Sequence, residues 1–142
     1  MIYLDTSVLV AYYLPEALST LAQQRLLTAS SVIVSELAQT EFVAALSLRQ
    51  RIGDLSLVDV MQVTALFTNH LASGLYVPLH LDSAVYRQAH TYIVRYDLPL
   101  KAPDALHLAA AALEQALLVT ADQQLARNAQ TLAIDVELLA TL

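Results

Sequence analysis

Short apolar runs recur along the chain and are separated by segments with helical spacing. The runs at residues 1–4, 31–34 (SVIV) and 116–120 (ALLVT) carry no charge and are rich in large or β-branched apolar residues, which is typical of strands buried on both faces. Residues 75–79 (LYVPL) are a further candidate, and their proline favours an edge position. Residues 134–138 (IDVEL) are the last candidate. The pattern therefore predicts about five strands.

The segments between these runs have the apolar spacing of amphipathic helices. They are residues 7–14, 16–28, 35–51, 54–73, 83–96, 104–116 and a short stretch after Asp122. Strands that alternate with helices predict right-handed crossovers and a parallel sheet covered on both faces. Because we find no internal repeat, low-complexity tract or linker, we expect one α/β domain over residues 1–142.

Glu41 stands out within the predicted helix 35–51. Ser35 is a good N-cap for this helix, and Glu41 shares a stripe with apolar residues that we expect to face the core, namely Leu37, Ala44, Ala45 and Leu48. An ionised carboxylate on such a face is costly to bury without a partner. No lysine or arginine lies three or four residues away on either side. Either this face of the helix is more exposed to water than the pattern indicates, or Glu41 has a partner that offsets the cost.

Composition limits where this chain works and what it binds. Hydrophobic residues make up 57% of the sequence, yet no apolar run approaches the roughly 20 residues of a membrane span. There is no cysteine, and the first residues, MIYLD, do not resemble a signal peptide, so we expect a cytoplasmic protein without disulfides. The formal charge of −6 is unusual for general nucleic-acid binding and favours metal cations or basic protein segments as partners.

Four acidic residues are expected near the carboxyl edge of the sheet, where function collects in open α/β folds. Asp5 follows the first strand, Asp122 comes two residues after ALLVT, and Glu41 lies two turns into the helix after SVIV. Asp104 opens the helix before ALLVT and reaches this edge if that helix starts near the crevice. Each aspartate has a structural alternative as a helix cap, an Asx-turn residue or a first-turn acid. Glu41, in mid-helix, has no such alternative.

Several carboxylates held close together repel one another unless a cation offsets their charge. A hard divalent ion such as Mg²⁺ or Mn²⁺ suits oxygen ligands and leaves room for substrate phosphates. Zinc is not expected, because the sequence lacks cysteine, an HExxH motif and paired histidines. An acidic site of this kind suits metal-assisted hydrolysis of phosphodiester bonds.

Four segments, in order along nearly the whole chain, carry a resemblance to a known family. They are IYLDTSVLVAYY, VSELAQTEFVAAL, LKAPDALHLAAA and LLVTADQQLA, and they resemble PIN-domain proteins, most of all the VapC-type toxins of bacterial toxin–antitoxin pairs. The resemblance implies a Rossmann-like three-layer α/β/α fold around a parallel sheet of about five strands. It also implies an Mg²⁺- or Mn²⁺-dependent endoribonuclease that a cognate antitoxin holds inactive.

The resemblance also assigns roles to individual residues. It implies that the metal ligands and catalytic acids are Asp5, Glu41, Asp104 and Asp122. The hydroxyls that would orient these carboxylates are those of Thr6, Ser7 and Thr120, for which ordinary capping is an equal alternative.

Some nearby residues receive a lesser role or none. Glu36 sits in the first helical turn beside Ser35, where the dipole explains it, so we do not take it as the site acid. His107 lies three residues after Asp104, and we expect it to be a packed helix histidine rather than a ligand or proton shuttle. Lys101, in the loop before Asp104, is our first candidate for a phosphate contact with RNA. Arg49, Arg51 and Arg127 fit helix-end charges better.

Other partners and functions stay open at this point. The acidic cleft should attract a basic antitoxin segment, whose arginines can pair with carboxylates, and the apolar excess in FVAALSL and AYYL suggests a homodimer or antitoxin interface. A structure-specific DNA nuclease could use the same acidic crevice. A non-catalytic interaction module, in which the acids only cap helices, is the remaining alternative.

Overall fold

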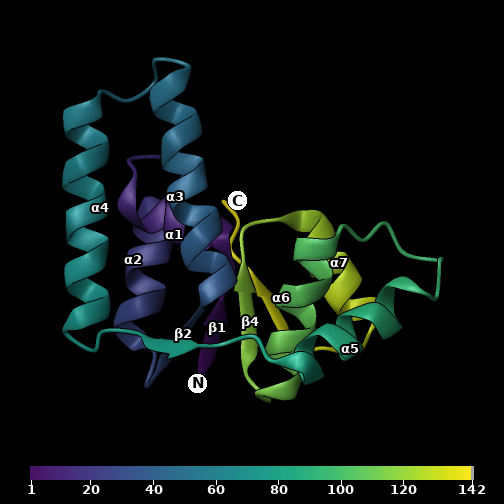
Figure 1. The fold of residues 1–142 in the computed structure, drawn as a ribbon. Coiled ribbons are helices and arrows are strands. Elements are labelled where there is room, and N and C mark those ends of the chain that lie inside the picture. The colour runs from purple at the N-terminus through teal and green to yellow at the C-terminus, as the bar shows by residue number, and fades with distance from the viewer. Residues whose placement is uncertain (142) are drawn as a thin grey trace.

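The computed structural model describes residues 1–141, which form five strands and seven helices (Figure 1). The strands are β1 (Ile2–Leu4), β2 (Val32–Ser35), β3 (Val77–Leu79), β4 (Leu117–Thr120) and β5 (Val136–Leu138). The helices are α1 (Thr6–Tyr13), α2 (Ser19–Thr28), α3 (Glu36–Arg51), α4 (Leu57–Ala72), α5 (Ser83–Ile93), α6 (Ala102–Leu113) and α7 (Gln123–Thr131). All the elements predicted from the apolar pattern are present in the predicted order.

The strands form one parallel sheet in the order β3-β2-β1-β4-β5. β1 lies at the centre, where Ile2 pairs with Val32 and Leu4 pairs with Val119. The chain builds one half of the sheet outward from β1 through β3, then returns to the other side of β1 with β4. The predicted parallel sheet is confirmed, and β3, which contains Pro78, lies at an edge as its proline indicated.

Helices cover both faces of the sheet, which gives the predicted three layers (Figure 1). Alternate residues of a strand point to opposite faces. Ile2 and Leu4 pack with residues of α1, α2, α3 and α4, whereas Tyr3 packs with residues of α5, α6 and α7.

Helices α3 and α4 form an antiparallel arm that extends beyond the carboxyl edge of the sheet (Figure 1). The core-facing stripe predicted for α3 was wrong by one position: the buried residues are Ala38, Phe42 and Leu46, whereas Ala44 and Leu48 are exposed. Phe42 sets the orientation of the helix, because its ring packs against Tyr13 and Phe67 at centroid distances of 5.2 and 4.8 Å. Glu41 therefore lies at the border of the core and is only partly buried.

The abundant apolar residues have two locations. One group is buried between the sheet and the helices that cover it, and another is exposed, partly on the arm and partly elsewhere, as at Leu27 and Tyr96. No helix within residues 1–141 is both long and apolar enough to cross a membrane.

Helix α7 ends in a tight cap that places a non-glycine residue in a left-handed conformation. Ala133 has φ of 57°, its N–H donates to the carbonyl of Gln130, and the N–H of Ile134 donates to that of Ala129. This is the Schellman arrangement, in which glycine is favoured at the position of Ala133.

We expect Ala133→Gly to stabilise the protein by up to about 1 kcal/mol, because it removes the contact of Cβ with the backbone in this conformation. The matched control, Ala44→Gly on the exposed face of α3, should destabilise it by about 1 kcal/mol. Urea unfolding measures the free energy of unfolding of both variants. A loss of stability in Ala133→Gly would contradict this account of the cap.

Candidate functional site

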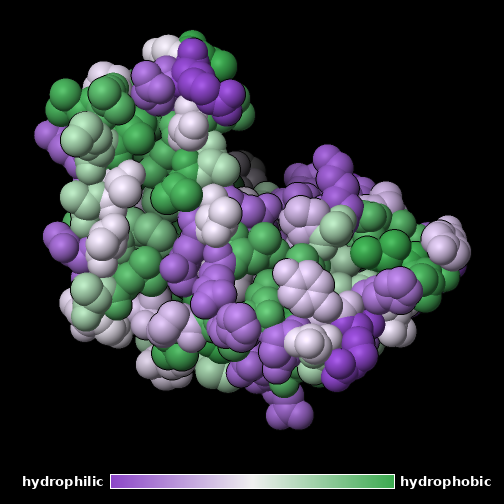
Figure 2. All heavy atoms as spheres, in the orientation of Figure 1, coloured by the Kyte–Doolittle hydropathy of each residue, from purple (hydrophilic) through white to green (hydrophobic). Residues whose placement is uncertain are grey.

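Four acidic side chains from four different elements gather at the carboxyl edge of the sheet. Asp5 follows β1 and Asp122 follows β4, Glu41 lies in the second turn of α3, and Asp104 lies in the first turn of α6. We call this group the four-acid site. In the space-filling view the molecule is hollowed between the α3–α4 arm and the body that contains α5, α6 and α7 (Figure 2).

Asp5 is the most deeply buried of the four acids, with only 5% of its surface exposed. One carboxylate oxygen accepts hydrogen bonds from Ser7 Oγ (2.6 Å) and from the backbone N–H of Val8 (3.4 Å), and the other accepts one from Thr120 Oγ1 (2.8 Å). Burial raises the pKa of Asp5, and these hydrogen bonds partly offset the rise. Asp5 thus caps α1, as the structural alternative proposed, and also lies at the centre of the acidic edge.

The hydroxyls of Ser7 and Thr120 tie the ends of β1 and β4 together. Ser7 Oγ accepts from the backbone N–H of Ala121 (2.9 Å), and Thr120 Oγ1 accepts from that of Asp122 (3.0 Å). Each hydroxyl donates to Asp5 at the same time. Two of the three predicted hydroxyls therefore contact the same carboxylate, and the third, Thr6, contacts Glu41 instead.

Both explanations left open for Glu41 hold in part, because its side chain is partly exposed and also has two partners from other helices. Its Oε1 accepts from His107 Nε2 (2.6 Å) and from Thr6 Oγ1 (2.9 Å). The hydrogen bond from His107 and, to a lesser extent, that from Thr6 hold the pKa of Glu41 below its usual value, against the opposing effect of burial.

His107 is the site residue that sequence reasoning underestimated. It is buried, as expected of a packed helix histidine, but its ring joins two polar groups: Nε2 contacts Glu41 and Nδ1 lies 2.7 Å from the hydroxyl of Tyr3. The Tyr3 hydroxyl donates to Ser35 Oγ (3.0 Å). The available signal was its spacing from Asp104, which puts both residues on one side of α6.

Asp104 and Asp122 differ in the hydrogen bonds that their carboxylates accept. Asp122 caps α7, because one of its oxygens accepts from the backbone N–H groups of Gln124 (2.8 Å) and Leu125 (3.1 Å). Asp104 accepts no hydrogen bond from any of residues 1–141. Its pKa is raised by burial first, then by the negative charges of Asp122 and Glu41. Among the four acids, Asp104 is therefore the one that receives no hydrogen bond from residues 1–141.

The four-acid site fits a hard divalent ion in its chemistry, although it is not a preformed cage. Within residues 1–141, no three Asp, Glu or His side chains lie close enough together to enclose an ion as they stand. However, the carboxylate of Asp104 has no donor, and Asp122 and Glu41 each have one oxygen without a hydrogen bond from these residues. Mg²⁺ suits such an open set of oxygens, because it retains several waters and binds one or two carboxylates directly.

Lys101 lies three positions before Asp104, and its charge slightly lowers the pKa of that acid. It is exposed and precedes the first turn of α6. Three arginines are engaged elsewhere in ion pairs with carboxylates, namely Arg25, Arg49 and Arg95. Glu36 pairs with His80 at 3.0 Å on the surface, which agrees with its exclusion from the site.

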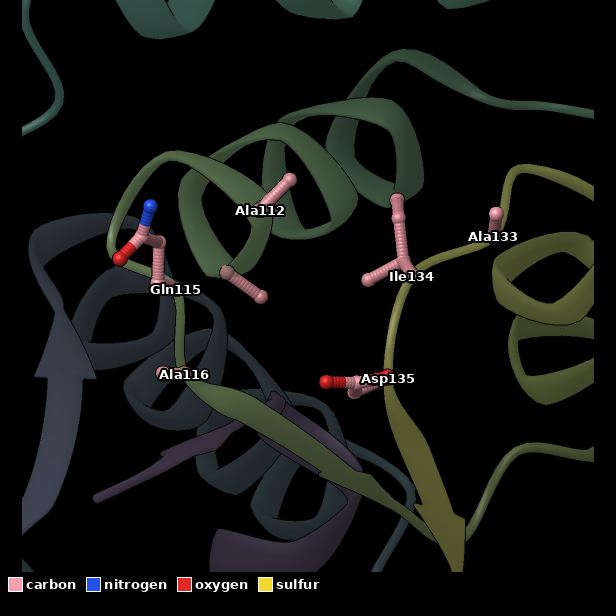
Figure 3. Close-up of a pocket in the computed structure, with 7 residues that line it drawn as sticks. Ala112, Gln115, Ala116, Ala133, Ile134 and Asp135 are labelled. Atoms are coloured by element: carbon pink, nitrogen blue, oxygen red, sulfur yellow. The ribbon is translucent and has the colours of Figure 1, made fainter.

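A separate cavity of about 220 Å³ lies at the opposite edge of the sheet (Figure 3). It is lined by the end of α6 and by the residues before β5, including Gln115, Ile134 and Asp135. None of the four acids lines it, so it is distinct from the four-acid site.

The sequence and the fold were compared with known proteins. The family model described as the PIN domain matches residues 2–130, whereas no curated protein matches the sequence. Among solved structures, VapC20 of Mycobacterium tuberculosis, described as a sarcin–ricin loop cleaving toxin, superposes with a TM-score of 0.70 at 18% identity, over 89% of this chain and 94% of that one.

Two toxin–antitoxin complexes are also similar in fold. FitAcB from Neisseria gonorrhoeae has a TM-score of 0.68 at 20% identity, over 96% of each chain. VapBC2 from Rickettsia felis, solved bound to a DNA fragment from its promoter, has a TM-score of 0.69 at 17% identity, over 99% of this chain and all of that one. These likenesses establish the predicted fold.

The raised pKa of Asp104 leads to a prediction about stability. Because its pKa is higher in the folded protein than in the unfolded chain, the ionised form destabilises the metal-free fold above the unfolded pKa. We expect Asp104→Asn to be more stable than the wild type at pH 7, by roughly a few tenths of a kcal/mol, because solvent screens a half-buried carboxylate. The advantage should shrink as the pH falls through the folded pKa, where Asp104 becomes neutral in the wild type too.

Asp59→Asn is the matched control, since Asp59 is exposed in the first turn of α4. Its loss should cost a few tenths of a kcal/mol, because only the interaction with the helix dipole disappears. Denaturant unfolding in the presence of chelator, at several pH values, gives the free energy of unfolding of each variant relative to the wild type. A wild type more stable than Asp104→Asn at pH 7 would contradict the repulsion described here.

Proposed function

Because this chain belongs to the PIN domain family, we propose that it is a metal-dependent endoribonuclease and acts as the toxin of a toxin–antitoxin pair. Its fold resembles those of a sarcin–ricin loop cleaving toxin and of two toxin–antitoxin complexes. In the proposal, the four-acid site hydrolyses phosphodiester bonds of RNA with the help of Mg²⁺ or Mn²⁺.

One observation carries the proposal: Asp104 is partly buried beside other carboxylates without a donor of its own. The charges of Asp122 and Glu41 both raise its pKa. A structural carboxylate is normally paired or hydrogen-bonded, as Asp5 is here. An unpaired acid among other acids is typical of a site that binds a cation when the protein is active.

The chain's own residues would divide the work. All four acids would hold the ion: Asp104, Asp122 and Glu41 have oxygens without a hydrogen bond, and Asp5, the fourth ligand, is linked through Thr120 to the start of α7. A bound Mg²⁺ or Mn²⁺ supplies an activated water and stabilises negative charge on the phosphoryl oxygens. Lys101 is placed to contact a neighbouring phosphate, since it is exposed at the entrance to α6.

A partner chain also belongs to the proposal. The arm carries exposed apolar side chains, among them Val43, Leu48, Ile52, Leu57, Val58, Met61 and Leu66. Figure 2 shows apolar residues in green on the face of the arm that it draws. A surface of this kind suits burial against protein, and we propose a homodimer that an antitoxin also binds, with a basic segment in the acidic hollow. A monomer at micromolar concentration by light scattering would contradict the dimer.

The direct test is cleavage of single-stranded RNA, and of DNA of the same sequence, with Mg²⁺ or Mn²⁺. We expect cleavage of RNA that chelator abolishes, and a loss of at least about 100-fold in both Asp5→Asn and Glu41→Gln. Glu114→Gln, at the exposed C-cap of α6, should cleave like the wild type.

Other outcomes would contradict the proposal in distinct ways. Cleavage of DNA but not RNA would favour a structure-specific DNA nuclease. Cleavage that survives in both site variants would place the activity elsewhere. If no nucleic acid is cut and no divalent ion binds, the acids serve as caps in a non-catalytic interaction module.

A further inference from the structure

We propose that His107 is a positioning residue, which holds the Glu41 carboxylate in one orientation so that a single oxygen faces the ion. The inference rests on the proposed function of the four-acid site and assigns a task to a residue outside the four acids.

Two donors from different helices converge on one oxygen of Glu41. His107 Nε2, from α6, and Thr6 Oγ1, from α1, reach Oε1 at 2.6 and 2.9 Å. An ionised carboxylate only accepts hydrogen bonds, so both donors carry the proton in these contacts. Oε2 accepts no hydrogen bond from residues 1–141, and the Glu41 side chain is 33% exposed. The carboxylate is therefore fixed on one side and open on the other.

The histidine is itself anchored from behind. His107 is 3% exposed, and its Nδ1 lies 2.7 Å from the hydroxyl of Tyr3, which is fully buried on β1. Tyr3 in turn donates to Ser35 Oγ, which accepts from the backbone N–H of Ala38 at the start of α3. The contacts thus form a closed path from α3 through β1 and α6 back to α3, and they leave the imidazole little freedom to turn.

The type of side chain at position 107 matters for this role. An arginine facing Glu41 would pair with both oxygens through its planar fork and would leave none for a cation. A leucine would fill the space but donate nothing, and Glu41 would lose one of its two donors. A histidine donates one N–H to one oxygen and uses its second nitrogen for the anchor.

The test is the affinity of the intact protein for Mn²⁺ alone, measured by titration calorimetry. We expect His107→Leu to weaken binding by about 10- to 100-fold, the usual effect of removing a group that orients a metal ligand. His107→Gln should lose less, because its amide can still donate. Tyr3→Phe should weaken binding in the same direction by removing only the anchor hydroxyl. The matched control is His90→Gln at an exposed histidine of α5, which should bind like the wild type.

A double-mutant cycle separates positioning from general support of the fold. In the Glu41→Gln background, adding His107→Leu should change Mn²⁺ affinity by less than about twofold, because the carboxylate that His107 orients is already absent. An equal loss in both backgrounds would overturn the inference. If His107→Leu does not fold, Tyr3→Phe carries the same cycle.

The remaining outcomes distinguish this inference from the proposed function. A wild type that binds Mn²⁺ together with a His107→Leu variant that binds equally well would overturn the positioning role alone. A wild type that binds no Mn²⁺ would overturn the proposed function and, with it, this role.

Discussion

The cost of holding several carboxylates at one edge of a sheet is the constraint on which the rest of this structure depends. Asp5 is almost completely buried at the end of the central strand, where two hydroxyls and a backbone N–H donate to it and partly offset the cost of burying its charge. Glu41 is held by a histidine and a threonine. Asp104 has no such donors, and burial and the neighbouring charges of Asp122 and Glu41 raise its pKa. The protein can thus fold with these acids at one edge of the sheet, and a cation bound beside them would still be favourable.

The structural and functional explanations of these acids are compatible. Asp5 and Asp122 each cap a helix with one oxygen, and the cap fixes where the carboxylate stands. Glu41 gains the same fixity from His107 and Thr6. Capping therefore does not compete with ion binding here, because it provides the rigid support that an oriented carboxylate needs.

The fold could be predicted from the sequence because its signals are local. Short uncharged runs such as SVIV and ALLVT are strands, Ser35 caps α3 and Pro78 marks an edge. The orientation of α3 could not be predicted, because it depends on how the Phe42 ring packs against α1 and α4. The pairing of Glu41 with His107 could not be predicted either, because they are 66 positions apart in the sequence and only the crossover of α6 brings them together.

The most direct test of the central claim, that the acids form a cation site, is equilibrium unfolding of the wild type and Asp5→Asn with and without Mn²⁺. An ion present at about 100 times its dissociation constant should stabilise the wild type by roughly 2.7 kcal/mol, a rise in Tm of about 5–10 °C. Asp5→Asn should gain much less. If Mn²⁺ stabilises neither protein, or stabilises both equally, the four carboxylates do not form a cation site.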